Sequence, residues 1–174
     1  MYYFKDKDVL VFLIDDNKLE LKLLKNQFAT CKESYKVKTY TTGEELIDEI
    51  AKNPIPNKYI TFIILDYFLK TRKNKEAKDG IQILKLLKKT NPDFNIIILS
   101  AYENDDNIDF RKEYKEMGAC AYVRKNEFSF PIINNIIQRI VFNKNLKKRK
   151  AESRISIILF IITALIILFI SIFN

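Results

Sequence analysis

Five short apolar runs, separated by segments with helical periodicity, constrain the fold of this chain more than any other feature. Three of them are continuous and rich in β-branched residues, as in strands that are covered on both faces: VLVFLI at 9–14, YITFIIL at 59–65 and NIIIL at 95–99. The run KVKTY at 36–40 alternates and carries lysines, which is typical of an edge strand. ACAYV at 119–123 is the fifth run.

Helical patterns fill the gaps between these runs. Apolar spacing predicts helices that begin near Asn17, after Thr42, after Gly80 and around Pro131, and a polar helix over 105–117. The faces expected to be buried are Leu19, Leu23, Leu24 and Phe28; Leu46, Ile47 and Ile50; Ile83, Leu84, Leu86 and Leu87; and Ile132, Ile133, Ile136, Ile137, Ile140 and Val141. Strand and helix alternate five times, which predicts an α/β fold with a doubly wound parallel sheet.

Residues 155–173 contain no charged side chain. A helix over these nineteen residues is roughly 28 Å long, close to the hydrocarbon thickness of a bilayer. We therefore expect a C-terminal transmembrane helix over 155–173. A buried core helix or a helix for self-association is the alternative.

The net charge of +8 is concentrated just before that stretch. Residues 144–154 hold six basic side chains and one acid, while the remaining 24 basic and 21 acidic residues nearly balance. We expect 1–142 to be a folded domain and 143–154 a basic juxtamembrane linker that lies beside anionic lipid on the cytoplasmic side of the cell membrane. A nucleic-acid partner is not expected, because no binding fold accompanies the basic cluster.

The chain has no histidine and only two cysteines, Cys31 and Cys120. The missing imidazole excludes a Ser-His-Asp or Cys-His catalytic site and any phosphohistidine on this chain. Two cysteines are too few for a disulfide framework or a zinc cluster, so we expect both to be reduced thiols.

Reactive side chains follow the predicted strands where their carboxyl ends meet, which is where such sheets carry their sites. Asp15 and Asp16 end the first strand, Asp66 the third, Ser100 the fourth and Lys125 the fifth. Clustered carboxylates repel one another unless a cation joins them, and Mg²⁺ is the natural partner. One carboxylate opposite such a metal can attack a phosphoryl group. Taken singly, each residue has a structural explanation: a helix cap, a turn or a solvated loop lysine.

Together these residues resemble the receiver domain of two-component response regulators. The matching segments are FLIDDNKLE, FIILDYFL, the Asp79–Gly80 pair, IIILSA and ACAYVRK, and the resemblance covers about residues 6–142. It implies a CheY-like, flavodoxin-like fold with strand order 2-1-3-4-5.

The resemblance also implies the site residues. Asp66 is the expected phosphoacceptor. Mg²⁺ is expected on Asp16 and Asp66, on Asp15 through water, and on the backbone carbonyl of Phe68. Ser100 falls at the switch hydroxyl, Lys125 at the phosphate-binding lysine and Tyr122 at the aromatic switch position.

Two features depart from the family pattern. Asn126 stands where receivers usually have proline after the lysine, which leaves the aim of Lys125 open. A basic insertion at 70–78 is either a solvated loop or a docking element for an acidic partner.

The expected function is a membrane-anchored single-domain receiver, not an enzyme. A histidine kinase or a histidine phosphotransfer protein is the expected phosphodonor, and an unidentified downstream protein or a homodimer the expected output, without DNA binding. The resemblance also implies slow self-dephosphorylation, because the bulky Phe68 and Tyr102 stand at the positions that in receivers flank the path of the hydrolytic water. A phosphorylation-independent scaffold with a receiver fold is the alternative. A haloacid-dehalogenase-type phosphatase is disfavoured, because Phe68 stands where it needs a second aspartate.

Overall fold

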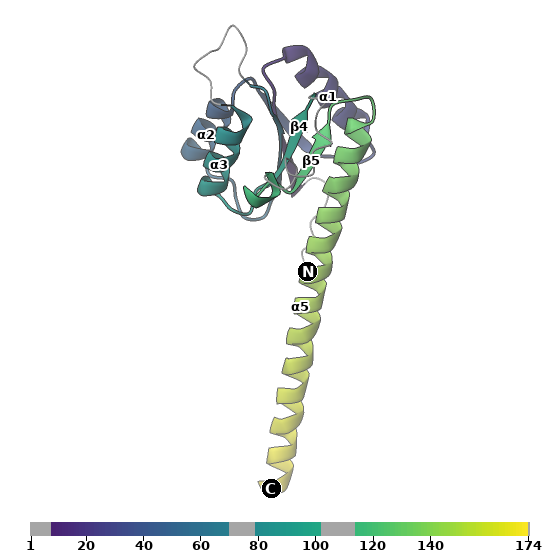
Figure 1. Cartoon of the computed structure of the whole chain (residues 1–174). Coiled ribbons are helices and arrows are strands. Elements are labelled where there is room, and N and C mark those ends of the chain that lie inside the picture. Colours follow the sequence, from purple (N-terminus) through teal and green to yellow (C-terminus); the bar gives the residue numbers. More distant parts are fainter. Residues whose placement is uncertain (1–7, 70–78, 102–113, 174) are drawn as a thin grey trace. The chain divides into compact units, whose positions relative to one another are not determined.

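A five-stranded parallel sheet forms the centre of the computed structural model, which describes residues 8–69, 79–101 and 114–173 (Figure 1). The strand order is β2-β1-β3-β4-β5, and every neighbouring pair is parallel. The predicted order 2-1-3-4-5 is thereby confirmed. The strands are β1 (Val9–Ile14), β2 (Lys36–Tyr40), β3 (Ile60–Asp66), β4 (Asn95–Ser100) and β5 (Ala121–Arg124).

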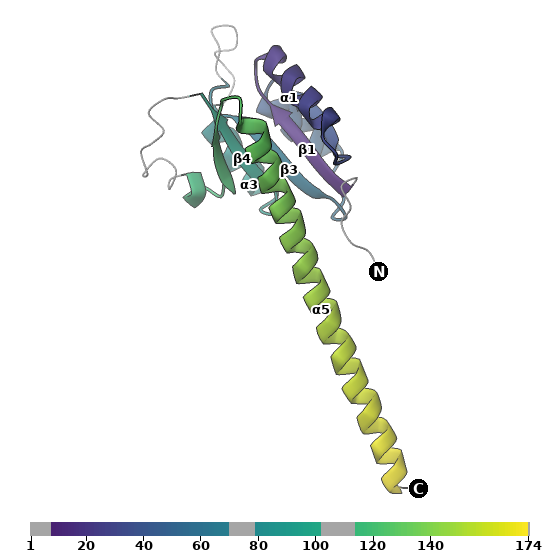
Figure 2. The same ribbon diagram turned by 90° about the vertical axis from the view of Figure 1, so that its right-hand side faces the viewer.

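Helices cover both faces of the sheet, as continuous apolar strands require. They are α1 (Lys18–Thr30), α2 (Gly43–Lys52), α3 (Gly80–Thr90) and the first residues, up to Ile137, of α5 (Ser129–Phe173). Close contact between Gly43 and the Ile83 side chain places α2 beside α3. On the other face Phe28 of α1 meets Phe130 at the start of α5, with ring centres 5.0 Å apart. Figures 1 and 2 show these two helical layers with the sheet between them.

Polar side chains cap the first three helices where the sequence predicts their starts. The side-chain oxygens of Asn17, Thr42 and Asp79 accept hydrogen bonds from backbone N–H groups in the first turns of α1, α2 and α3. Each bond satisfies a donor that has no partner within its helix. These caps fix where the helices begin relative to the strand ends.

The buried face of α1 differs from the predicted one. Leu21, Leu24 and Phe28 are buried, whereas Leu19 and Leu23 are 63% and 50% exposed. The apolar residues of this helix form two adjacent stripes with helical spacing, and sequence periodicity cannot tell which of them faces the sheet. The prediction for Leu19 and Leu23 was therefore wrong.

The predicted polar helix at 105–117 lies largely outside the described residues. Its described end is helical at 114–116. Gly118 has a φ of +94°, and the N–H groups of Gly118 and Ala119 donate to the carbonyls of Lys115 and Tyr114. This is a Schellman cap, which favours glycine because of the positive φ. The predicted stop at Gly118 is confirmed.

The chain divides into two compact units, Phe4–Ile137 and a second unit made mainly of Gln138–Asn174. Within the second unit the predicted linker at 143–154 is helical and continuous with the residues that follow it, so it forms no separate element. Between 155 and 169 the large apolar side chains that the structure describes are 46% to 74% exposed.

No helix is long and apolar enough to span a membrane within the part of the chain that the structure describes. The transmembrane helix predicted over 155–173 is therefore not supported. The side chains at 164, 168 and 170–173 belong to that prediction and lie outside the described residues.

Candidate functional site

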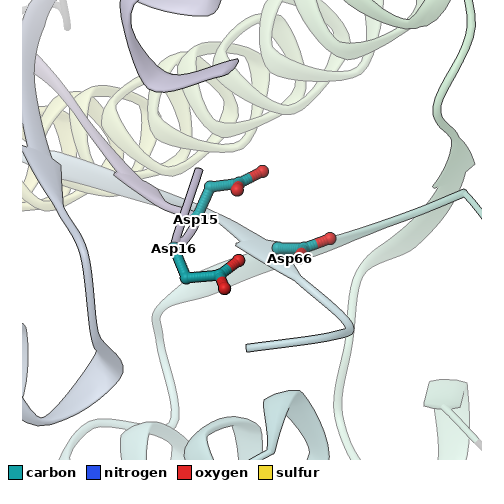
Figure 3. Close-up of side chains that lie close together, drawn as sticks. All are labelled: Asp15, Asp16 and Asp66. Carbon is teal, nitrogen blue, oxygen red and sulfur yellow. The ribbon is translucent and has the colours of Figure 1, made fainter. Parts of the chain in front are cut away.

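Three carboxylates meet at the carboxyl ends of β1 and β3 (Figure 3). Asp15 and Asp16 follow Ile14, which is paired with Leu65, the residue before Asp66. One carboxylate oxygen from each aspartate lies within 4.8 Å of the other two. Asp15 and Asp66 are 3% and 5% exposed, so water screens the mutual repulsion of their charges only weakly. The predicted convergence of Asp15, Asp16 and Asp66 is confirmed.

Lys125 balances part of this negative charge. Its Nζ lies 2.6 Å from Oδ2 of Asp15 and 2.9 Å from Oδ1 of Asp66. Its backbone N–H donates to the carbonyl of Ser100, which ties the end of β5 to the end of β4. The lysine therefore reaches the carboxylates without a proline after it.

Asn126, which stands in place of that proline, forms hydrogen bonds that hold the loop between β5 and α5. Its Oδ1 accepts from the backbone N–H of Phe128, and its carbonyl accepts from the N–H and the hydroxyl of Ser129. This side-chain turn shapes the entry into α5. No peptide bond of the described residues is cis, so the bond between Lys125 and Asn126 is trans.

The pKa values follow from burial and charge. Burial raises the pKa of Asp66 from its ordinary 3.8 to about 6, against the attraction of Lys125, and the charge of Asp15 adds to the rise. Burial and the neighbouring Asp15 also raise the pKa of Asp16. Burial lowers the pKa of Lys125, but its hydrogen bond to Asp15 and its attraction to Asp66 outweigh that effect and leave the pKa raised.

The carboxylate cluster fits a divalent cation. Three carboxylates face one ammonium group, which leaves an excess of negative charge. Among the described residues, Oδ2 of Asp16 is buried and has no hydrogen-bond partner. A buried carboxylate oxygen without a partner is costly, and a hard cation such as Mg²⁺ would satisfy it.

Ser100 and Tyr122 lie at their predicted strand positions. Ser100 is fully buried at the end of β4, one residue beyond Leu99, which pairs with Asp66. Tyr122 on β5 is partly buried, and its ring stacks on the buried Tyr114 at 5.8 Å. Phe68 is half exposed beside the site. Tyr102 and the basic insertion at 70–78 lie outside the described residues.

A row of aromatic rings, which no sequence pattern predicted, begins beside Asp66. Tyr67 packs edge-on against Phe68 at 4.4 Å and against Tyr114 at 5.9 Å, and Tyr114 then stacks on Tyr122. The row connects the residue after Asp66 to the aromatic switch position. The position of Tyr67 directly after Asp66 was the available signal, but the contact with Tyr114 depends on tertiary packing.

Comparisons with known proteins agree with this geometry. The sequence pattern of the response regulator receiver domain family matches residues 11–137. No curated protein matches the chain in sequence.

Solved receiver domains share the fold. The receiver domain of Francisella response regulator 1452 is 26% identical, with 78% of this chain and 97% of that one covered and a TM-score of 0.58. A receiver domain protein from Clostridium thermocellum is 24% identical over 79% of this chain and 98% of that one, with a TM-score of 0.61. A CheY-like receiver domain protein from Methanospirillum hungatei is 20% identical over 80% and 97%, with a TM-score of 0.60.

Proposed function

The chain belongs to the response regulator receiver domain family, and on that premise we propose that Asp66 accepts a phosphoryl group from a phosphohistidine. The observation that carries the proposal is the buried Asp66 carboxylate, held between Lys125 and the two aspartates at the end of β1. In the transfer, a lone pair of an Asp66 oxygen forms a bond to phosphorus. The P–N bond breaks, and its electron pair returns to the imidazole of the donor. The product is an aspartyl phosphate.

The surrounding side chains have distinct roles in this transfer. Lys125 already contacts Asp66, and its ammonium group would pair with a phosphoryl oxygen as negative charge is delivered there. The Ser100 hydroxyl would donate to another of those oxygens. To make this bond the Ser100 side chain would move toward the phosphoryl group, which would leave room for the Tyr122 ring to turn inward. The conformation of β5 and α5 would therefore change with phosphorylation.

Mg²⁺ would be held by Asp16, Asp66 and the Phe68 carbonyl, with Asp15 acting through water. When bound, it supplies positive charge that lowers the repulsion between the carboxylates and the incoming phosphoryl group.

The phosphodonor is a histidine kinase or a histidine phosphotransfer protein. Since this chain has no histidine, the phosphohistidine has to come from a partner. The output passes to a downstream protein or through a homodimer, and the domain is a phosphoryl acceptor and not an enzyme with a separate substrate.

A scaffold that works without phosphorylation is the rival function. Its main support was the missing proline, which left the aim of Lys125 open. The two short contacts of Lys125 with Asp15 and Asp66 remove that support and favour the phosphoryl acceptor.

We further propose that residues 155–173 anchor the protein in the cell membrane, with the receiver on the cytoplasmic side. The support is the uncharged sequence, the six basic residues just before it and the exposed apolar side chains between Ile155 and Phe169. Exposed apolar surface of this extent marks an interaction site.

Phosphoryl transfer from phosphoramidate to the purified full chain tests the phosphoryl acceptor. We expect intact mass spectrometry to show one added phosphoryl group with Mg²⁺ and none with a chelator. Asp66→Asn should abolish the addition, whereas Asp93→Asn, at an exposed aspartate, should retain it. We also expect decay over minutes or longer, because the bulky Phe68 side chain would hinder the attacking water molecule. A scaffold would show no addition, and addition that survives Asp66→Asn would move the acceptor elsewhere.

A further inference from the structure

A groove of about 420 Å³ lies at the opposite end of the strands from Asp66. It is bounded by the starts of β1 and β2, the end of α2 and the loop between α2 and β3. A volume of this size is typical of small-molecule sites. Its apolar lining includes Leu10, Phe12 and Ile55, and its polar lining includes Lys36, Glu49 and Tyr59.

The floor of the groove is apolar. Phe12 belongs to the buried core, and Leu10 and Ile55 are partly buried against it. Pro54 and Pro56 add rigid apolar walls from the loop. Apolar atoms of a ligand in this groove would leave water for a surface that is continuous with the core, which favours binding.

Two lysines lie beside Tyr59, one of the residues that line the groove. The Lys36 Nζ lies 3.0 Å from the Tyr59 hydroxyl and 4.7 Å from the centre of its ring, and the Lys58 Nζ lies 5.1 Å from the same centre. The hydrogen bond from Lys36 also lowers the pKa of Tyr59. Two ammonium groups are thus gathered on one tyrosine ring at the edge of an apolar floor.

Among the described residues that line the groove, no acid pairs with Lys36, and Lys58 lies outside this lining, beside the Tyr59 ring. Glu49 is the one acidic residue of the groove's described lining. The Glu49 carboxylate is already taken, because Oε1 accepts from Lys38 at 2.6 Å and Oε2 from the Tyr40 hydroxyl at 2.7 Å. Glu49 is therefore not available to Lys36 or Lys58, and the exposed ammonium groups of these two lysines can pair with an added anion.

We propose that this groove binds a small organic anion with an aromatic body, of the aryl carboxylate class. The carboxylate would lie between Lys36 and Lys58, and the ring would cover Leu10 and Ile55 beside the Tyr59 ring. A neutral ligand would not pair with the two ammonium groups, and a purely polar anion would not use the apolar floor. The site is separate from Asp66 and does not depend on phosphoryl transfer.

Equilibrium dialysis of 2-naphthoate against the full chain in phosphatidylcholine nanodiscs tests this site, with empty nanodiscs as the blank. We expect saturable binding that weakens at least tenfold in the double variant Lys36→Gln, Lys58→Gln. The matched variant Lys85→Gln, Lys89→Gln changes two lysines of α3 that do not line the groove, and should bind as the unmodified chain does. The neutral analogue 2-naphthalenemethanol should bind at least tenfold more weakly.

Equal binding by the two double variants would overturn the proposal, as would binding no greater than that of empty nanodiscs. If the groove binds an acidic peptide instead, 2-naphthoate should bind no more than it does to empty nanodiscs. Thermal melts check that both double variants stay folded. Phosphorylation of Asp66 should be the same in both, so the two proposals can fail separately.

Discussion

At the scale of single residues, Lys125 is the side chain on which the site most depends. Its ammonium group is largely buried and joins Asp15 to Asp66 by two short contacts. A buried cation between two carboxylates stabilises the fold mainly because its removal leaves uncompensated charge.

The variant Lys125→Gln tests this role. We expect the free energy of unfolding without Mg²⁺ to fall by about 3 kcal/mol, as when one partner of a buried ion pair is removed. Addition of Mg²⁺ should restore part of the loss. Urea denaturation measures both effects, and Lys85→Gln, at an exposed lysine, is the control. Equal stability of the two variants would contradict the assigned role.

The raised pKa of Asp66 predicts how pH affects metal binding. Because its pKa is about 6 instead of 3.8, the folded protein holds a proton on Asp66 more tightly than the unfolded chain does. Mg²⁺ needs the carboxylate, so its apparent affinity should fall as pH drops below about 6 and level off above it. Isothermal titration calorimetry between pH 5 and 8, with Asp93→Asn as the control, measures this. A pH-independent affinity would contradict a cation at Asp66.

At the scale of elements, the close contact between the end of β3 and the start of α3 positions Asp66. The backbone N–H of Gly80, at the start of α3, donates to the carbonyl of Tyr67. A Cβ at Gly80 would lie 2.7 Å from the Asp66 carbonyl oxygen and 2.9 Å from that of Tyr67. These are backbone atoms that cannot rotate away, so the two elements can meet this closely only at glycine.

Gly80→Ala should therefore move the end of β3. We expect a loss of about 1–3 kcal/mol of unfolding free energy, the usual cost of overpacking, together with weaker Mg²⁺ binding. Gln82→Ala, at an exposed position of the same helix, should leave both unchanged. Chemical denaturation measures the free energy of unfolding, and calorimetry measures Mg²⁺ binding. Wild-type values of both for Gly80→Ala would show that the end of β3 accommodates the added methyl group at little cost.

The elements also show how far the sequence could predict this protein. The convergence of the three aspartates and Lys125 followed from residues at strand ends, because parallel strands bring those ends together, whereas the strand order followed from the resemblance to receiver domains. Leu19 and Leu23 were misplaced, because two apolar stripes on α1 fit the same period. The turn made by Asn126 and the stacking of Tyr114 on Tyr122 were missed, because both depend on contacts that no local pattern encodes.

At the scale of the whole molecule, residues 155–173 would determine where the receiver acts, because they would hold it at the cell membrane. We expect the full chain to sediment with membranes and to resist extraction by alkaline carbonate. Removal of residues 155–173 should release the protein into the supernatant, because the apolar surface is lost. Replacement of Lys147 and Lys148 by glutamine leaves residues 155–173 intact and should not release the protein. Release of the full chain by carbonate would contradict an anchor in the membrane.

At the same scale, we expect the phosphorylated protein to carry its phosphoryl group on Asp66. Borohydride reduction of the phosphorylated full chain converts an aspartyl phosphate to homoserine, which tandem mass spectrometry can locate. We expect this conversion at Asp66, only with Mg²⁺, and not at Asp15 or Asp16. Conversion at another aspartate, or none after exposure to a phosphodonor that phosphorylates a control receiver, would contradict it.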